Sequence, residues 1–443
     1  MIISGYTTPY ELLKEEFRQK KEEGFRIPPD AEKKFALIDR NSPVDENAYE
    51  EIYSLLNGAP MREDFPFVEP NELDEIRNAR PERKQRKFVL NLNDDELLDK
   101  YHGAWLGRSV GCALGKPVEC RDWRKIRQYL IQHGDWPLTD YISGRKVENQ
   151  VLDPWSERSQ RENIAFMESD DDIRYTLIGL MLFERKGKEF TSRDIAELWS
   201  QTLPMNFVCT AERQALMNFN NHRFGWEFDK HYTSTFNNPY REWIGAQIRG
   251  DFFGFMAPGD PERAAEYAYR DACWTHVKNG IYGEMFFAAL EAAAFVESDP
   301  AKLVETALGE IPANCRLSAA IHEALAEIPK YKNMEAFMEW HGKVYADMHC
   351  VHTINNAVLC IAALFFGGMN PDRSICESVT GGLDTDCNGA TVGAIAGIVS
   401  GQRNFGGTLA ARLHDTIRAE FCEFQEISMS DLAKRTLAVY RKL

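Results

Sequence analysis

Few features of this sequence point to strands, to secretion or to a membrane. Strand-like alternation is scarce, and the start of the chain has neither the basic residues nor the apolar stretch of a signal peptide. The longest apolar run, Ala357–Phe366, is half as long as the ~20 residues that a membrane-spanning helix requires. The ten cysteines are scattered, without any Cys-x-x-Cys pair. These absences predict a cytoplasmic protein with reduced thiols and no membrane partner.

Positive charge is also in short supply. The 443 residues carry 52 Lys and Arg against 68 Asp and Glu, which gives a net charge of −16. Nucleic-acid binding needs clustered Lys and Arg side chains, so this balance predicts no nucleic-acid partner. The negative net charge is still compatible with a small anionic ligand that is held by local dipoles. Hydrophobic residues make up 44% of the chain, which is ordinary for a globular protein with a large core. The oligomeric state stays open.

What the sequence does contain is helical periodicity along almost its whole length. Glu11–Glu23 has the pattern of a charged surface helix, and residues 24–92 are richer in Pro, Asn and charge. Asn93, followed by three acidic residues, has the form of an N-cap at the start of a long helix. We therefore predict an all-α protein in which residues 1–92 form an N-terminal helical extension and residues 93–443 form the main domain.

Two sets of glycines recur at every fourth position, each along one predicted helix. They are Gly103, Gly107, Gly111 and Gly115, and Gly389, Gly393, Gly397 and Gly401. An interior glycine costs a helix about 0.5–1 kcal/mol relative to alanine, so a repeated set indicates that another backbone must approach closely. Because the two stripes share one period, we predict that the two helices pack backbone to backbone at the centre of the main domain.

Acidic residues gather at the starts of two predicted helices. Asp170–Asp172 precedes the apolar stretch Ile173–Phe183, and Asp384 and Asp386 precede the second set of glycines. A helix start favours negative charge, so one such cluster alone is typical of helix capping. Two clusters in regions poor in Lys and Arg favour one shared, oxygen-lined site for a hard cation such as Mg²⁺, Mn²⁺ or Ca²⁺.

Three segments, taken together, resemble the motifs of the ADP-ribosylglycohydrolase family. Gly103–Glu119 is similar to the family's opening motif, Ser169–Asp172 to its Thr-Asp-Asp-Thr segment, and Gly382–Cys387 to its Gly-Gly-Asp-Thr-Asp-Thr segment. The resemblance covers about residues 95–425, with the motifs in the right order. It implies a compact multi-helix fold with two Mg²⁺ or Mn²⁺ ions at its centre. It also implies hydrolysis at the anomeric carbon of an ADP-ribosyl group, with residues 93–443 as the catalytic domain.

The resemblance also implies roles for individual residues. The residues that it implies as metal ligands are Asp170, Asp171, Asp172, Asp384, Asp386 and Cys387. The register of the first segment is open, because either Ser169 or Asp170 can take the position of the family's Thr. A riboside hydrolase needs a group that activates water on one face of the sugar, and the candidates are Asp170, Asp171 and Glu119. The candidates for substrate binding are His276, Asn279 and Gly115.

The chain departs from the family's pattern at three places. Cys387 replaces the usual Thr, and a thiol is a poor ligand for Mg²⁺. Cys112 stands where the family usually has Asp, and His276–Lys278 replaces a His-x-His pattern. The expected substrate is therefore either an ADP-ribosylated partner or a small molecule. Two alternatives stay open: an N-riboside hydrolase for a small nucleoside-like compound, and a non-catalytic structural protein like the crystallins that resemble this family.

Overall fold

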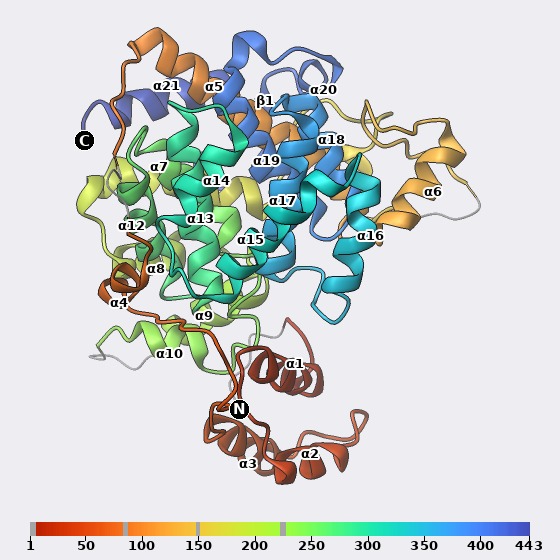
Figure 1. The fold of residues 1–443 in the computed structure, drawn as a ribbon, viewed down its shortest axis with the longest axis vertical. Coiled ribbons are helices and arrows are strands. Elements are labelled where there is room, and N and C mark those ends of the chain that lie inside the picture. The colour runs from red at the N-terminus through yellow and green to blue at the C-terminus, as the bar shows by residue number, and fades with distance from the viewer. Residues whose placement is uncertain (1–5, 83–86, 148–150, 222–226) are drawn as a thin grey trace.

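Helices make up almost all of the regular structure in this chain (Figure 1). The computed structural model describes residues 6–82, 87–147, 151–221 and 227–443. Within these ranges it contains 21 α-helices, several short 3₁₀ turns and one two-stranded antiparallel ribbon, in which Thr416–Ile417 (β1) pairs with Ile427–Ser428 (β2). The prediction of an all-α fold is confirmed. In the same ranges no helix is long and apolar enough to cross a bilayer.

The helices divide between the N-terminal segment and the main body. The first 92 residues hold α1 (Pro9–Glu22), α2 (Pro29–Ala36), α3 (Glu46–Asn57) and α4 (Leu73–Ala79). The helices that follow are α5 (Asp94–Gly115), α6 (Trp123–His133), α7 (Asp171–Lys186), α8 (Ser192–Thr202), α9 (Thr210–Asn220), α10 (Lys230–Thr235), α11 (Asp251–Phe255), α12 (Pro261–Ala272), α13 (Asn279–Ala294), α14 (Pro300–Leu308), α15 (Arg316–Glu327), α16 (Met334–Val344), α17 (Thr353–Gly367), α18 (Pro371–Thr380), α19 (Thr385–Ser400), α20 (Thr408–Ala411) and α21 (Met429–Tyr440).

The centre of the main body is the pair formed by α5 and α19, the most extensively packed pair of helices in the structure. As expected from the sequence, Asn93 is the N-cap of α5. The Asn93 side chain accepts a hydrogen bond from the Glu96 backbone N–H, and the Glu96 carboxylate accepts one from the Asn93 N–H. This reciprocal capping box satisfies two of the donors that a helix start leaves free. From Gly103 to Gly115 every residue of α5 is buried.

The two sets of glycines meet along this pair, so the predicted backbone-to-backbone packing is confirmed. The facing positions are Gly103 with Gly397, Gly107 with Gly393, Gly111 with Gly389, and Gly115 with Thr385. A Cβ added to any of these glycines would lie closer than 3.0 Å to a backbone atom of the opposite helix. Gly401 differs from the expectation. It lies beyond the end of α19 with a φ of +67°, although its backbone still lies against Gly103 and a Cβ added to it would meet the Asp99 side chain of α5.

The N-terminal helices have a small apolar core of their own. In Figure 1, α1, α2 and α3 lie together at one end of the molecule, while α4 lies higher, against the main body. The buried residues of this small core are Leu13, Phe17, Ala31, Tyr49, Ile52, Tyr53 and Leu56. The chain then runs along the main body, where the Val68 N–H donates to the Asn314 carbonyl and the Phe88 N–H to the Gly259 carbonyl. The division into two domains at residue 92 stays a prediction.

Candidate metal centre

The acidic residues singled out in the sequence lie at two helix starts that face the C-terminal half of α5. Asp170 is the N-cap of α7, and its side chain accepts a hydrogen bond from the Asp172 N–H at 3.1 Å. Asp384 is the N-cap of α19, and its own N–H donates to the Asn356 side-chain oxygen at 3.2 Å. Because α5 and α19 are locked together by their glycines, the position of Asp384 relative to α5 is fixed by the core of the fold.

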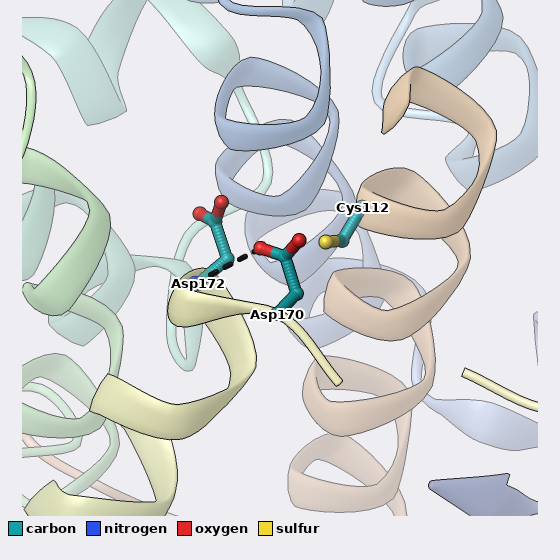
Figure 2. Close-up of side chains that lie close together, drawn as sticks. All are labelled: Cys112, Asp170 and Asp172. Atoms are coloured by element: carbon teal, nitrogen blue, oxygen red, sulfur yellow. Dashed lines mark hydrogen bonds between the residues drawn. The ribbon is translucent and has the colours of Figure 1, made fainter. Parts of the chain in front are cut away.

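Three groups of side chains in the described residues offer atoms close enough to share a metal ion. Within each group the candidate ligand atoms all lie within 4.8 Å of one another. The groups are Cys112, Asp170 and Asp172; Asp172, Asp386 and Cys387; and Glu119, Asp384 and Asp386. Figure 2 shows the first group, in which the Cys112 thiol on α5 points toward the carboxylates at the start of α7. Since Asp172 and Asp386 each belong to two groups, the three groups form one continuous cluster.

Asp170 is the carboxylate of this cluster that is held in its ionised form. Its burial works against ionisation, but Lys116 and Arg174 outweigh that effect and lower the pKa of Asp170 to about 2. The Lys116 Nζ lies 3.0 Å from Asp170 Oδ2 and also donates to the Ser169 carbonyl oxygen at 3.0 Å. Lys116 therefore supplies a fixed positive charge at one side of the cluster.

The other carboxylates are strained electrostatically by burial and by one another. Burial and then Asp170 raise the pKa of Asp171 to about 7 and that of Asp386 to about 6. Asp386 and then burial raise the pKa of Glu119 to about 9. For Asp172 and Asp384, burial is the main cause of a pKa well above the usual range. Like charges at short range and low exposure to water disfavour ionisation, and a divalent cation would remove that conflict.

The donor set fits a hard cation. The Oδ1 atoms of Asp384 and Asp386 are buried and have no hydrogen-bond partner, which is costly for a carboxylate unless a cation or water lies against it. Carboxylate oxygens are the ligands that Mg²⁺, Mn²⁺ and Ca²⁺ prefer. The thiols fit less well: burial raises the pKa of Cys112 and of Cys387 well above the usual range, so both are protonated at neutral pH. Cys387 instead donates to Asp172 Oδ2 at 3.2 Å.

Several residues that the sequence did not single out hold the cluster in place. Arg108, fully buried on α5, donates to the Asp172 carbonyl at 2.7 Å and forms an ion pair with Asp251. The Asn356 side-chain oxygen accepts from the Asp384 N–H and, at 2.6 Å, from the Asn388 side chain. Lys116 and Arg108 lie within the opening motif Gly103–Glu119, so their place in that motif could have marked them as residues near the site. Asn356, on α17, has no such signal, because nothing in its local sequence marks it as a partner of Asp384.

The remaining predicted site residues have different surroundings. Asp171 is half-buried at the start of α7 and belongs to none of the three groups. The Gly115 carbonyl accepts a hydrogen bond from the Thr385 hydroxyl at 2.7 Å, as part of the helix pair. His276 is fully buried and its Nδ1 lies 2.8 Å from the Thr275 hydroxyl. The Asn279 amide donates to Glu69 and Glu242, outside the acidic cluster. Substrate-binding roles for these residues stay predictions.

Comparison with known proteins places the chain in a family. The model of the ADP-ribosylglycohydrolase family matches residues 93–442, which is more than half of the chain. The chain therefore belongs to the ADP-ribosylglycohydrolase family, a family of hydrolases that act on ADP-ribosyl groups. A solved structure described as an ADP-ribosylglycohydrolase-related protein complex is 18% identical, with a TM-score of 0.48. The match covers 78% of this chain and 99% of that one. No curated protein matches the chain significantly.

Proposed function

We propose that this protein is a glycohydrolase that uses two Mg²⁺ or Mn²⁺ ions to cleave the bond at the anomeric carbon of an ADP-ribosyl group. The observation that carries the proposal is the meeting of Asp170 and Asp172 with Asp384 and Asp386 in one buried cluster that has too little positive charge of its own. Family membership supplies the reaction class. The substrate, the metals and the cytoplasmic location belong to the proposal.

The residues that would hold the ions are the oxygen donors of the three groups, namely Asp170, Asp172, Asp384, Asp386 and Glu119. When bound, such ions supply Lewis acidity and compensate the carboxylates' charge. Asp170, kept ionised by Lys116, suits a permanent ligand. Cys387 contributes a hydrogen bond to Asp172 rather than an anionic ligand.

Glu119 and Asp171 are the candidates for proton transfer. Both are only half-buried, whereas Asp170, Asp172, Asp384 and Asp386 are buried. A general base has to reach the attacking water, and a half-buried carboxylate such as that of Asp171 can meet solvent. Asp171 also lies outside the three ligand groups, which leaves its carboxylate available to take a proton from water as it attacks the ribosyl carbon.

The test is release of ADP-ribose from an ADP-ribosylated protein, measured by chromatography with Mg²⁺, with Mn²⁺ and with EDTA. We expect activity only with a divalent ion, and a loss of about 100-fold or more for Asp386→Asn and Asp172→Asn. Asp299→Asn is the matched control, because Asp299 also caps a helix, α14, but lies outside the cluster. Full activity of Asp386→Asn would overturn the proposal. A chain that releases nothing and gains no thermal stability from either metal would be a non-catalytic structural protein.

A second candidate is an N-riboside hydrolase for a small nucleoside-like substrate, and one observation favours it. Tyr6, from the N-terminal segment, lies near the cluster: its ring contacts Tyr240 edge to face, and its phenol is within electrostatic range of Cys209 and Glu119. A tyrosine at that place leaves less room for a protein substrate beside Glu119. Release of ribose from a panel of nucleosides, compared with release of ADP-ribose from modified protein, separates the two candidates.

A further inference from the structure

Two cysteines meet directly beside the acidic cluster. The Sγ atoms of Cys120 and Cys350 lie 2.6 Å apart, although the residues are 230 positions apart in the chain. Cys120 immediately follows Glu119, and Cys350 lies in the turn that leads into α17. Both residues are partly exposed and both are free thiols in this structure. A covalent S–S bond is about 2.05 Å long, so only a small movement separates this pair from a disulfide.

The backbone around Cys120 is held firmly. The Cys120 N–H donates to the Leu383 carbonyl at 2.7 Å. The backbones of Arg121 and Leu383 also pair in an isolated antiparallel β-bridge. Cys120 has a φ of +53°, a backbone conformation that residues other than glycine seldom adopt without support. Because Leu383 precedes Asp384, the segment that carries Glu119 and Cys120 is fastened to the start of α19.

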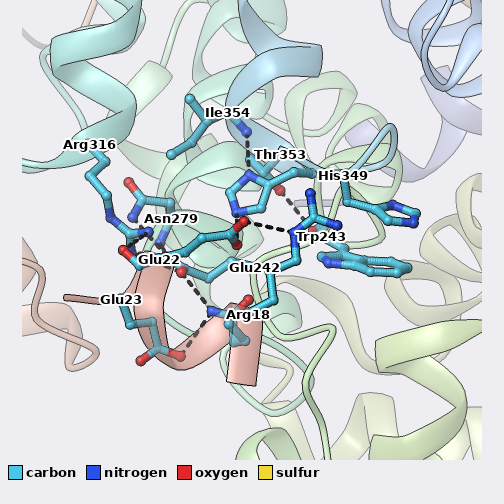
Figure 3. A network of polar contacts seen from close by, with 12 residues as sticks. Arg18, Glu22, Glu23, Glu242, Trp243, Asn279, Arg316, His349, Thr353 and Ile354 are labelled. Carbon is cyan, nitrogen blue, oxygen red and sulfur yellow. Dashed lines mark hydrogen bonds and ion pairs between the residues drawn. The ribbon is translucent and has the colours of Figure 1, made fainter. Parts of the chain in front are cut away.

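The turn around Cys350 is held by contacts of its neighbour His349 and of Asn356. The neighbouring His349 ring stacks on Trp243 with a centroid separation of 4.1 Å and an interplanar angle of 12°. Figure 3 shows these two rings side by side at the edge of a polar network. The Asn356 amide donates to the Cys350 carbonyl at 2.8 Å, and the same side chain accepts from the Asp384 N–H. Both thiols are therefore presented by segments that also position a carboxylate of the cluster.

We propose that Cys120 and Cys350 form a redox modification site, in which a peroxide converts the two thiols into a reversible disulfide that links the Glu119 segment to the turn before α17. The His349 Nδ1 atom lies 3.7 Å from the Cys350 Sγ atom, and a ring nitrogen beside a thiol favours the thiolate, which suits Cys350 to attack first. The inference does not depend on the proposed function, because it concerns bond formation between two thiols of this chain.

The reaction balances with hydrogen peroxide as the oxidant. The Cys350 thiolate attacks one peroxide oxygen, the O–O bond breaks, and the hydroxide that leaves takes up a proton to become water, which produces a sulfenic acid on Cys350. The Cys120 sulfur then attacks the sulfenic sulfur, the S–O bond breaks, and a second water leaves with the Cys120 proton. In total two thiols lose two electrons and two protons, and one peroxide is reduced to two waters. A dithiol reductant reverses the link by exchange.

The disulfide would close a very long loop, which gives it a measurable consequence apart from catalysis. A cross-link between distant residues removes conformational freedom from the unfolded chain, and the effect grows with the length of the closed loop. The two sulfur atoms already lie within reach of each other in the folded chain, so the link closes this loop without bringing distant segments together. Oxidation is therefore expected to raise the melting temperature by a few degrees.

The experiment compares the full-length reduced protein with protein treated with a small excess of hydrogen peroxide. After denaturation, free thiols are alkylated and counted by intact mass, and digested peptides are mapped. We expect two fewer alkylated cysteines than in the reduced protein, a linked peptide pair containing Cys120 and Cys350, and full reversal by dithiothreitol. Cys350→Ser is expected to keep all of its remaining thiols and to show no rise in melting temperature. Cys422→Ser, which removes an exposed cysteine elsewhere, is the matched control and is expected to behave as the original chain.

Several outcomes would overturn the proposal. One is complete alkylation after peroxide treatment. Another is a disulfide that involves Cys422 or any third cysteine in place of this pair. A third is overoxidation of Cys350 to a sulfinic acid without a cross-link. The peptide map of the unaltered chain decides between these outcomes, so the test holds even where a serine variant folds poorly. Loss of glycohydrolase activity plays no part in it, which keeps this inference separate from the function proposed above.

Discussion

At the scale of single residues, this chain keeps ionisable groups buried in two different ways. Asp170 stays charged because Lys116 lies 3.0 Å away. Glu291, on α13, stays neutral: burial and the nearby Asp251 raise its pKa well above the usual range. A paired charge and a protonated acid both avoid the large cost of an isolated buried ion. Within the acidic cluster that includes Asp170, the carboxylates of Asp384 and Asp386 have no such ion pair, and each keeps a buried Oδ1 atom without a hydrogen-bond partner.

Replacing Cys387 with threonine tests what the unusual thiol does. Burial keeps Cys387 protonated, and a neutral thiol is a poor ligand for Mg²⁺, whereas a hydroxyl oxygen is a suitable one. We expect Cys387→Thr to bind Mg²⁺ about 10-fold more tightly, by titration calorimetry. Cys376→Ser, a buried cysteine on α18 outside the cluster, is the control and should leave the affinity unchanged. An unchanged affinity for Cys387→Thr would mean that position 387 does not face the ion.

His341 gives the stability of the protein a predictable dependence on pH. It is buried in α16, and its burial, opposed in part by the hydrogen bond with the Asn355 carbonyl, lowers its pKa to about 4. An unfolded histidine has a pKa of about 6.5, so below that pH the unfolded chain takes up a proton that the folded chain does not. The contribution of His341 to the free energy of unfolding is therefore lost as the pH falls from about 6.5 to about 4, and below that range this contribution changes no further.

For this one residue the loss between pH 7 and pH 5 should be about 2 kcal/mol. Urea unfolding of His341→Gln at both pH values measures it: the variant should show a smaller difference between the two pH values by that amount. His322→Gln, at an exposed position, should show the same difference as the original chain. If His341→Gln also kept the full difference, the histidine would be protonated in the folded protein.

At the scale of helices, the spacing of a few residues was enough to predict the centre of the fold. Glycines at every fourth position lie on one face of a helix, so two such sets predict a close contact without any knowledge of the tertiary structure. The same local logic placed Asp170 and Asp384 at helix starts. It did not show that α19 ends before Gly401, because a glycine that continues a periodic pattern and a glycine that ends a helix look alike in sequence.

Gly111→Ala tests the contact between α5 and α19. The added methyl group would overlap the Gly389 carbonyl on the opposite backbone, which can yield only if the whole helix pair separates. We expect a loss of about 3 kcal/mol or more in the free energy of unfolding. Gly342→Ala, in α16, is the control: a Cβ there meets nothing within 4 Å, so it should stabilise the chain by about 0.5–1 kcal/mol. Equal effects of the two substitutions in denaturant titrations would contradict the role of the ladder.

At the scale of the whole molecule, the N-terminal segment is joined to the main body by buried ion pairs. Arg241 donates to Glu16 at 2.7 Å and to Glu23 at 2.6 Å, and all three side chains are buried. Figure 3 shows a neighbouring part of this network, where Arg316 meets Glu242. The sequence could not predict these pairs, because Arg241 is more than 200 positions from its partners and its local pattern resembles that of a surface loop.

Removing the charge of Arg241 should release the N-terminal helices before the main body unfolds. Arg241→Met would remove the ion pairs that Arg241 makes with both Glu16 and Glu23, while Glu23 keeps its ion pair with Lys278, and an unpaired buried charge costs about 3–5 kcal/mol. Because α1–α3 have only a small core of their own, that cost should appear as local opening rather than as uniform destabilisation. Hydrogen exchange read by mass spectrometry is expected to show faster exchange in residues 9–57, with exchange in α5 and α19 unchanged.

Two further variants make the Arg241 prediction decisive. Lys33→Met breaks an exposed pair with Asp30 on the same N-terminal segment and should change exchange very little, since exposed pairs contribute about 0–1 kcal/mol. Combining Arg241→Met with Glu16→Gln and Glu23→Gln removes the stranded charges and should recover most of the lost protection. Recovery would identify uncompensated charge as the cause. If the triple variant opened as readily as Arg241→Met alone, packing and hydrogen-bond geometry around Arg241, rather than its charge, would be what holds the N-terminal segment to the main body.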